Sequence, residues 1–376
     1  MRVLIAPDKF KGSLTAAEVA DHLATGIRKA APGTEIDTCP IADGGEGTVD
    51  AAVSAGFTPV IATVSGPTGG PVTAFYARKG TTAVIELASA SGLHQLPGGQ
   101  SAPRTASSRG TGELIAAALD AGAQTIMIGL GGSACTDGGA GMIEALGVRL
   151  LDAAGRPVGP GGDGLPSIAR LDFEGLHPAL SEADIEVACD VDNLLLGRRG
   201  AAAVYGPQKG ADPADVSRLD DALAHWNTLV SRATGTHHAT TPGAGAAGGV
   251  GFAALAVLGA NVRPGIELLL DLVGFEQRLA TADLAITGEG SLDTQTLHGK
   301  GPAGVAAAAL RENVPALAVA GRVELTDEQL ARANFRGAYA LLDLEPAPDR
   351  CMTHAAELLE IVAAQLAGKW IHSTID

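Results

Sequence analysis

Acidic and lysine side chains stand among glycines directly after five predicted strands. Glycines allow backbone N–H groups to reach phosphate oxygens, carboxylates bind Mg²⁺, and lysines offset the remaining charge. Phosphoryl transfer needs these groups, since its catalysis consists mostly of positioning and electrostatic stabilisation. In an open α/β sheet, ligands bind beyond the carboxyl ends of the strands, where these groups are expected to meet. The five stretches are 8–12 (Asp-Lys-Phe-Lys-Gly), 43–46 (Asp-Gly-Gly-Glu), 137–139 (Asp-Gly-Gly), 190–193 (Asp-Val-Asp-Asn) and 289–293 (Glu-Gly-Ser-Leu-Asp).

Each motif also has a plainer interpretation. A lone Asp-Gly pair is usually a turn, and Lys9 and Lys11 alternate in an extended segment where both could simply be solvated. Two further lysines, Lys209 and Lys300, are each followed by a glycine. One such motif would decide nothing. Five acidic motifs at corresponding strand ends favour a shared site for anions and metal over five unrelated turns.

The elements that must position these groups follow a repeated pattern of strand, Gly-rich turn and helix. Thr15 and Glu18 have the spacing of a capping box, and Val19, Leu23 and Ile27 then recur on one helical face. The alternation predicts a parallel α/β architecture. The region from about 58 to 88 differs, because its short alternating pieces predict an antiparallel sheet in a second domain. Parallel strands are predicted at 2–6, 36–41, 125–130, 185–188, 284–287, 316–320 and 338–342.

Composition excludes several classes of partner. The 376-residue chain has a formal net charge of −16, 3% aromatic residues and no run of lysine or arginine, so neither nucleic acid nor an anionic membrane is expected to bind. None of the four cysteines forms a Cys-x-x-Cys pair, which argues against a zinc knuckle. Residues 1–7 are typical of a first strand and not of a signal peptide, and the longest apolar stretch, 250–259, is too short to cross a bilayer. We expect a cytoplasmic protein that acts on a small molecule as a monomer or homodimer.

The stretch 129–134 suggests a competing function. Gly-Leu-Gly-Gly-Ser-Ala satisfies a relaxed dinucleotide-binding fingerprint after a strand, and Asp152 lies at about the right distance for a ribose-binding acid. This is the basis for the alternative of an NAD-dependent dehydrogenase of a small hydroxy acid. Against it, the glycines continue through 137–141, so the helix is expected to start too late for the tight turn of that fold. No histidine stands in a context that suggests hydride transfer.

The common kinase signatures are absent. The chain contains no G-x-x-x-x-G-K-[ST], no H-R-D and no D-F-G. A kinase of this sequence must therefore hold ATP by another route. A third hypothesis, a nucleotide-binding sensor without catalysis, is the weakest, because a sensor needs no cluster of carboxylates beside phosphate loops.

Taken together, these segments resemble the bacterial glycerate kinase family, the type found in glyoxylate and glucarate catabolism. The matching blocks arrive in the family's order and cover almost the whole chain. Lys9 stands where serine is expected in many members, and Cys135-Thr136 where Thr-Asn is commoner, but neither departure removes a charge that the site needs. The blocks are 6–14 (Ala-Pro-Asp-Lys-Phe-Lys-Gly-Ser-Leu), 42–48, 110–114, 131–139, 188–193, 205–210, 242–249, 287–293 and Gly299-Lys300.

The resemblance implies ATP and Mg²⁺ as cofactors and D-glycerate as the substrate, with 2-phosphoglycerate as the favoured product. It also implies an α/β fold of two domains with the site in the cleft between them. We expect a Rossmann-like domain with a parallel sheet at 1–60 plus 250–376. A second α/β domain with a mixed sheet, at 61–249, is expected to interrupt it.

Individual roles can then be assigned as expectations. Asp190 is the first choice for the base that takes the proton of glycerate, because it closes the buried strand 185–189, and Asp8 is the competitor. Four lysines are available for the substrate carboxylate or the phosphates: Lys11 and Lys300 are assigned to catalysis, Lys9 and Lys209 to substrate. The remaining candidates are Asp192 and Asn193 for substrate, Gly131, Gly132, Ser133, Asp137, Gly138 and Gly139 for phosphates, and Asp43, Glu46, Glu289 and Asp293 for Mg²⁺.

Overall fold

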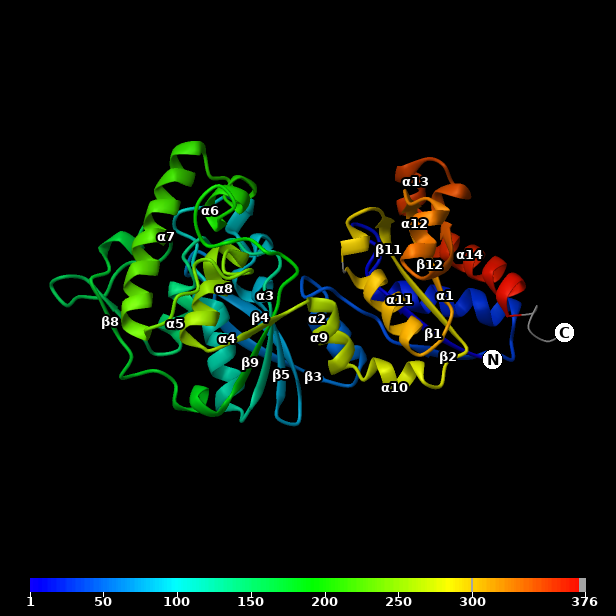
Figure 1. The fold of residues 1–376 in the computed structure, drawn as a ribbon, viewed down its shortest axis with the longest axis horizontal. Helices are drawn as coiled ribbons and strands as arrows, with labels where there is room; N and C mark the ends of the chain where they lie inside the picture. Colours follow the sequence, from blue (N-terminus) through cyan, green and yellow to red (C-terminus); the bar gives the residue numbers. More distant parts are fainter. Residues whose placement is uncertain (299, 372–376) are drawn as a thin grey trace. The chain divides into compact units, whose positions relative to one another are not determined.

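The chain leaves its first folded unit after residue 43 and completes it only after residue 265. The computed structural model describes residues 1–298 and 300–371. Unit 1 comprises residues 1–43, 50–55 and the part from 266 onward, and unit 2 comprises 44–49 and 56–265 (Figure 1). Relative to the borders expected from the sequence, unit 2 gains the stretches 44–49, 56–60 and 250–265.

Unit 1 contains a five-stranded sheet in which all strand pairs are parallel, in the order β13-β12-β11-β1-β2. The interior strand β1 is apolar from Val3 to Ala6, and these four residues are completely buried, as expected for a parallel strand with both faces covered. The predicted parallel sheet shared by the N- and C-terminal segments is confirmed. The strands are β1 (Arg2–Pro7), β2 (Glu35–Thr38), β11 (Leu284–Leu292), β12 (Ala316–Val323) and β13 (Phe335–Ala340).

Strand β2 is shorter than the predicted 36–41. It ends at Thr38, two residues before Pro40, which has no N–H to donate to the ladder. The chain nevertheless continues beside β1, because the amides of Cys39 and Ile41 donate to the carbonyls of Ile5 and Pro7. Asp43 is thereby delivered to the carboxyl end of the sheet.

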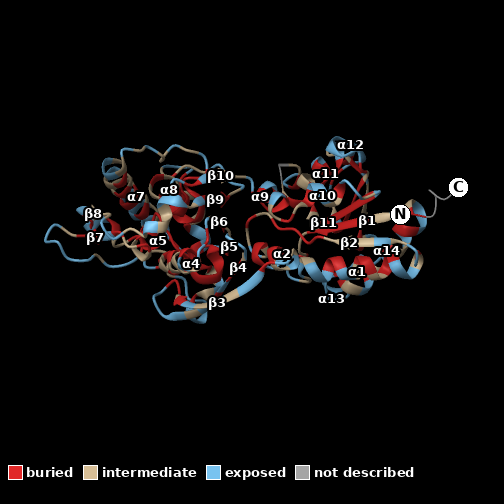
Figure 2. Ribbon diagram, turned by 90° about the horizontal axis from the view of Figure 1, so that it is seen from below, coloured by how far each residue is buried: buried red, intermediate tan, exposed pale blue. Residues whose placement is uncertain are grey.

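The helices of unit 1 cover both faces of its sheet. Figure 2 shows α1, α13 and α14 on one face and α10 and α11 on the other. Helix α1 begins as predicted, with the Thr15 hydroxyl and the Glu18 carboxylate forming a reciprocal capping box. The helices are α1 (Ala16–Ala30), α2 (Thr48–Ser54), α9 (Gly265–Leu272), α10 (Phe275–Leu279), α11 (Gly301–Arg311), α12 (Asp327–Arg332), α13 (Pro348–Thr353) and α14 (Ala355–Trp370).

Unit 2 contains a six-stranded mixed sheet in the order β10-β9-β6-β5-β4-β3. The predicted antiparallel region is present as the pairs β3–β4 and β4–β5, while β5, β6, β9 and β10 are parallel. The mixed sheet of the second domain is therefore confirmed. The strands are β3 (Thr58–Ser65), β4 (Pro71–Lys79), β5 (Thr82–Glu86), β6 (Thr125–Gly129), β9 (Asp184–Ala188) and β10 (Asn261–Arg263), with β7 (Arg149–Leu151) and β8 (Arg170–Asp172) in a separate small hairpin.

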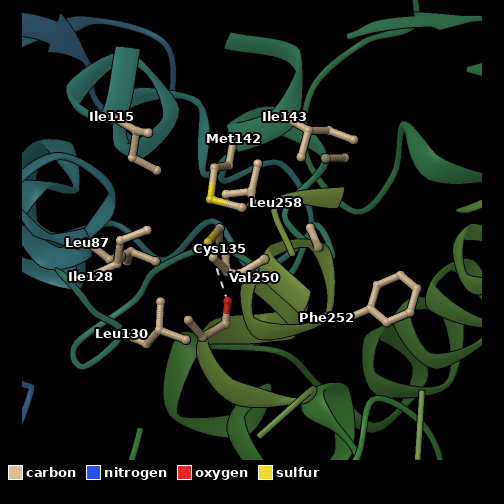
Figure 3. Close-up of a cluster of buried hydrophobic side chains, with 14 of the residues drawn as sticks. Leu87, Ile115, Ile128, Leu130, Cys135, Met142, Ile143, Val250, Phe252 and Leu258 are labelled. Atoms are coloured by element: carbon tan, nitrogen blue, oxygen red, sulfur yellow. Dashed lines mark hydrogen bonds between the residues drawn. The ribbon is translucent and has the colours of Figure 1, made fainter. Parts of the chain in front are cut away.

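The helices of unit 2 share one large apolar core with its sheet. Figure 3 shows part of it, where Leu87, Ile128, Met142 and Val250 gather around Cys135. The first residues of α8 depart from helical geometry, since Ala247, Gly248 and Gly249 have positive φ angles. The helices are α3 (Leu87–Ser91), α4 (Arg109–Asp120), α5 (Ala140–Ala145), α6 (Ala201–Tyr205), α7 (Pro213–Thr234) and α8 (Ala246–Val257). Among the described helices of both units, none is long and apolar enough to cross a membrane.

Helices α1 and α14 cross at a glycine. A β-carbon on Gly26 would lie 2.3 Å from the carbonyl oxygen of Glu360 and 2.7 Å from the Cβ of Ala363. Both neighbours belong to α14, so the helices approach more closely than any side chain at position 26 would permit.

We predict opposite effects for two glycine-to-alanine changes at this helix pair. Gly26→Ala should lower the free energy of unfolding by about 1–3 kcal/mol, because the added methyl group forces the helices apart. Gly368→Ala, at an exposed helical position with no atom within 4 Å of the new β-carbon, should raise it by up to about 1 kcal/mol. Urea midpoints at an unchanged m-value measure both. A tolerated Gly26→Ala would mean that α1 and α14 are not in this contact.

Candidate functional site

Three carboxylates on or after the strands of unit 1 influence one another. Asp8 comes directly after β1, and its amide donates to the Gly288 carbonyl of β11 at 2.8 Å. Glu289 is the next residue of β11, which continues to Leu292 and is longer than the predicted 284–287, and Asp43 follows β2. Burial raises the pKa of Asp8 to about 7, and the negative charges of Asp43 and Glu289 add to this effect. Asp8 and Asp43 come after their strands, as the sequence analysis expected, whereas Glu289 joins them from within β11.

Asp8 also lies beside the beginning of α11. A β-carbon on Gly301, the first residue of that helix, would be 3.6 Å from the Asp8 Oδ2. The other oxygen, Oδ1, accepts the Lys9 amide at 2.6 Å, which lowers the pKa of Asp8 but does not cancel the effect of burial. The result is a carboxyl group that gains and loses its proton near neutral pH.

Glu289 is held by a residue that the sequence analysis did not select. The hydroxyl of Thr296 is buried, donates to the Glu289 Oε1, and accepts the Asp293 amide at 3.1 Å. Burial raises the pKa of Glu289, whereas this hydrogen bond and the charge of Lys300 lower it. Thr296 is three residues beyond Asp293, a turn spacing that could have marked it.

The lysines of unit 1 differ in exposure. Lys11 is exposed, while Lys9 and Lys300 are half-buried. The Lys300 ammonium donates to the Gln295 side chain at 3.2 Å, next to the turn that carries Asp293. Gly299, which precedes Lys300 in the motif, lies outside the described residues.

The carboxylates of unit 1 fit a cation that is shared with other ligands. Burial is the main cause of the raised pKa values of Asp8 and Glu289, and neighbouring carboxylates add to it; a divalent ion would offset both effects. Within residues 1–298 and 300–371, no three His, Cys, Asp or Glu side chains form a group that could hold a metal ion by themselves. Mg²⁺ commonly takes one or two carboxylates and completes its shell with water and phosphate. Of the four expected ligands, Asp43, Glu289 and Asp293 belong to unit 1 and Glu46 to unit 2.

In unit 2, two glycine motifs meet at the carboxyl ends of the parallel strands. A β-carbon on Gly129 would lie 2.4 Å from the Gly44 carbonyl oxygen, and one on Gly131 would lie 2.7 Å from the Gly45 Cα. Glu86, the last residue of β5, accepts the amides of Gly47 and Val49 at 3.0 and 2.7 Å. Glu86 was not among the sequence candidates, although it ends a strand as the others do.

The second half of the loop between β6 and α5 is built around a buried carboxylate. Asp137 is completely buried and accepts hydrogen bonds from the amides of Ser108, Gly139 and Gly141 and from the Ser108 hydroxyl. The Gly138 amide donates to the Gly248 carbonyl. Gly138 and Gly139 have positive φ angles, and their missing side chains make room for Trp226 and Ala253. In this conformation the Asp137 side chain and the Gly138 and Gly139 amides are bonded within the protein and support the loop.

The first half of the same loop remains available for phosphate. Among the described residues, the amides of Gly131, Gly132 and Ser133 have no hydrogen-bond acceptor. Gly132 is exposed and has a φ of +72°. Of the six residues expected to bind phosphate, Gly131 and Gly132 combine an open amide with exposure to solvent, whereas Ser133 and Asp137 have open amides but are buried.

Lys209 lies beneath this loop. It is 1% exposed, and its ammonium donates to the Cys135 carbonyl. Burial lowers the pKa of Lys209, which the charge of Asp137 opposes. Lys209 therefore fastens the loop from below, and in this conformation it is not accessible to a substrate.

The acidic stretch after β9 is at the surface. Asp190 is exposed, and its Oδ1 accepts the Gly265 amide at 2.8 Å. Asp192 pairs with Arg199 at 2.8 Å, and Asn193 donates to the Arg199 carbonyl at 3.0 Å. This stretch is therefore at a strand end, as expected, but its side chains are much less desolvated than Asp8.

The dinucleotide-binding alternative finds no support. Helix α5 begins only at Ala140, eleven residues after the end of β6 at Gly129, so no tight strand-to-helix turn exists. Asp152, the expected ribose ligand, accepts the amides of Ala154 and Arg156 within its own turn. The fingerprint is a coincidence of a glycine-rich loop.

Comparisons with known proteins agree over nearly the whole chain. The model of the glycerate kinase family matches residues 3–371. Glycerate kinase of Bacillus subtilis strain 168 is 45% identical over 370 residues, covering 98% of this chain and 97% of the relative. Glycerate 2-kinase of Escherichia coli K12 is 45% identical over 331 residues, covering 87% and 86%. A crystal structure from Salmonella typhimurium LT2, assigned as a glycerate kinase 2, has a TM-score of 0.88 at 45% identity and full coverage of both chains.

The unusual pKa of Asp8 predicts a pH-dependent cost to stability. The folded state binds the proton more tightly than the unfolded state, whose pKa is near 3.8, so the free energy of unfolding falls as the pH rises from about 4 to about 7. Asp8→Asn cannot ionise and should match the wild type at pH 4 but exceed it at pH 8, by up to on the order of 4 kcal/mol.

Urea unfolding at both pH values, without nucleotide or metal, measures this difference. Asp190→Asn is the control for the same chemical change at an exposed carboxyl group. If Asp8→Asn changed stability equally at pH 4 and pH 8, Asp8 would not have a raised pKa.

Proposed function

Because this chain belongs to the glycerate kinase family, we propose that it transfers the γ-phosphoryl group of ATP to D-glycerate, with 2-phosphoglycerate as the product. The position of transfer is suggested by the Escherichia coli relative, which is named glycerate 2-kinase. The observation that carries the chemistry is the desolvated Asp8 carboxyl at the end of β1, beside Asp43 and Glu289.

Asp8 is proposed as the general base. As the hydroxyl oxygen of glycerate bonds to phosphorus and the bond to ADP breaks, the hydroxyl proton must leave, and a carboxylate within hydrogen-bond reach can accept it. A base is most effective when its pKa is close to the working pH, and the pKa of Asp8 is about 7. Asp190, the other candidate, is exposed and lacks this desolvation.

The other residues are proposed to bind and orient the reactants. MgATP supplies the phosphoryl group and a divalent charge that offsets the charge of the phosphates. The amides of Gly131, Gly132 and Ser133 are proposed to hold phosphate oxygens, since they have no other acceptor in the described part of the chain. Asp43, Glu289 and Asp293 are proposed to hold Mg²⁺, and Lys9, Lys11 and Lys300 to offset the charges of phosphate and of the glycerate carboxylate.

The reaction can be tested directly. The purified protein should release ADP from ATP only when D-glycerate and Mg²⁺ are both present, and it should reduce no NAD or NADP with the same substrate. Enolase added without phosphoglycerate mutase should then form phosphoenolpyruvate if the product is 2-phosphoglycerate. ADP release at the same rate without glycerate would argue against the proposal. A product that enolase does not convert would mean that another hydroxyl of glycerate is phosphorylated.

Two isosteric variants should separate the candidate bases. Asp8→Asn should lower turnover on the order of 10²–10⁴-fold while the KM for glycerate changes little, because it removes the proton acceptor and keeps the shape. Asp190→Asn should keep most of the turnover. Steady-state kinetics on both variants make the comparison, and a normal turnover in Asp8→Asn with a large loss in Asp190→Asn would assign the base to Asp190.

A further inference from the structure

Strand β3 lies at the edge of the sheet of unit 2 and pairs only with β4. Its outer face is exposed, with Ile61 at 75% and the neighbouring Phe75 of β4 at 39%. Ile61 and Phe75 are directly opposite each other in the β3–β4 pair. The edge therefore carries an apolar pair of side chains in water.

Two sets of hydrogen bonds determine which backbone groups face the open edge. In an antiparallel pair, the N–H and C=O of one residue point to the same side. Both groups of Phe75 bond to the hydroxyl of Ser89, which follows β5, so they face away from β3. The opposite residue, Ile61, must then direct its N–H and C=O away from β4, and the same parity applies to Thr63 and Ser65.

Helix α4 closes this edge only at one end. The Ser65 amide donates to Glu113 at 2.6 Å, and a β-carbon on Gly110 would lie 1.9 Å from the Ser65 carbonyl oxygen. Both contacts confirm that the backbone N–H and C=O groups of the odd-numbered residues of β3 point away from β4. Ile61 and Thr63 have no partner for their outward groups among the described residues, while Pro59 has no N–H to offer.

The other edges of the two large sheets are short or charged. Strand β2 carries Glu35 and Asp37, β13 carries the exposed Arg336, and β10 has three residues and ends at Arg263. Such features prevent edges from pairing with other chains. Strand β3 has eight residues without a charge, in a chain whose formal net charge is −16.

We propose that β3 pairs with β3 of a second copy of this chain, antiparallel about a two-fold axis at Ala62. Ile61 of one copy then faces Thr63 of the other, and each of these residues donates one hydrogen bond and accepts one. The edge is complementary to itself, because its two open residues are related by the axis that a two-fold dimer requires. Two strongly acidic chains repel each other, and this uncharged strand is where they can approach with the least repulsion.

The side chains support the same partner. The axis brings the exposed Ile61 and Phe75 of both copies to one face of the joined sheets, where each covers apolar surface of the other copy. A nucleic acid or an acidic membrane surface would find no positive charge along β3. The proposed pairing does not depend on the kinase activity.

The test is the molar mass of the purified full-length chain across a range of concentrations, by sedimentation or by light scattering after gel filtration. The wild type should be a dimer. Ile61→Lys should raise the dimer dissociation constant by at least about tenfold, because it places the like-charged ammonium groups of both copies close together beside the paired β3 strands. Leu310→Lys is the matched control: Leu310 is 55% exposed on α11 of unit 1, and its change should leave the dimer intact.

Thr63→Pro provides a second variant, since it removes one outward donor and adds no charge. Far-ultraviolet circular dichroism and urea midpoints establish that each variant is folded. A wild-type chain that is monomeric at all concentrations would overturn the proposal, as would dimers of Ile61→Lys and Thr63→Pro as strong as those of the wild type.

Discussion

Backbone segments in this protein approach one another more closely than a β-carbon permits. Helix α1 contacts α14 at Gly26, and the loop after β6 contacts the 44–47 loop at Gly129 and Gly131. Such close contacts require glycine, and they account for part of the chain's 51 glycines. Because backbone, and not side chain, forms the contact surfaces, amides such as those of residues 131–133 can be brought close to a ligand.

Two desolvated carboxylates, the completely buried Asp137 and the half-buried Asp8, have different roles. Asp137 is surrounded by amides and a hydroxyl that satisfy its oxygens, and its role is to hold the loop between β6 and α5. Asp8 is desolvated, accepts one amide and is close enough to two further carboxylates to be affected by their charge, so its pKa is raised to about 7. The same side chain is a scaffold where donors converge on it and a titrating group where they do not.

The sequence predicted most strands of the two large sheets and part of the site, but it missed β10 and the β7–β8 hairpin, which are only three residues per strand. The apolar run Val3–Ala6 and the rule that ligand-binding residues follow parallel strands selected Asp8 and Asp43, while Glu289 was selected from a strand, β11, that continues past it to Leu292. The burial of Lys209 and Asp137 could not be predicted, because the same sequence pattern, a polar residue followed by glycine, occurs both in solvated turns and in packed loops. Glu86 and Thr296 escaped notice because their partners are distant backbone amides or a carboxylate in another element.

The pairing of β1 with β11 also determines the order in which the protein can take shape on the ribosome. Val3 is synthesised early, but its partner Leu284 emerges 281 residues later. Unit 2 ends at residue 265 and is complete by then. The apolar strand β1 must therefore wait, exposed or shielded by a chaperone, while the middle of the chain folds first. In the interval when residue 265 has left the ribosome and residue 284 has not, a finished unit 2 is tethered to an N-terminal strand that can pair with β2 but lacks β11 on its other side.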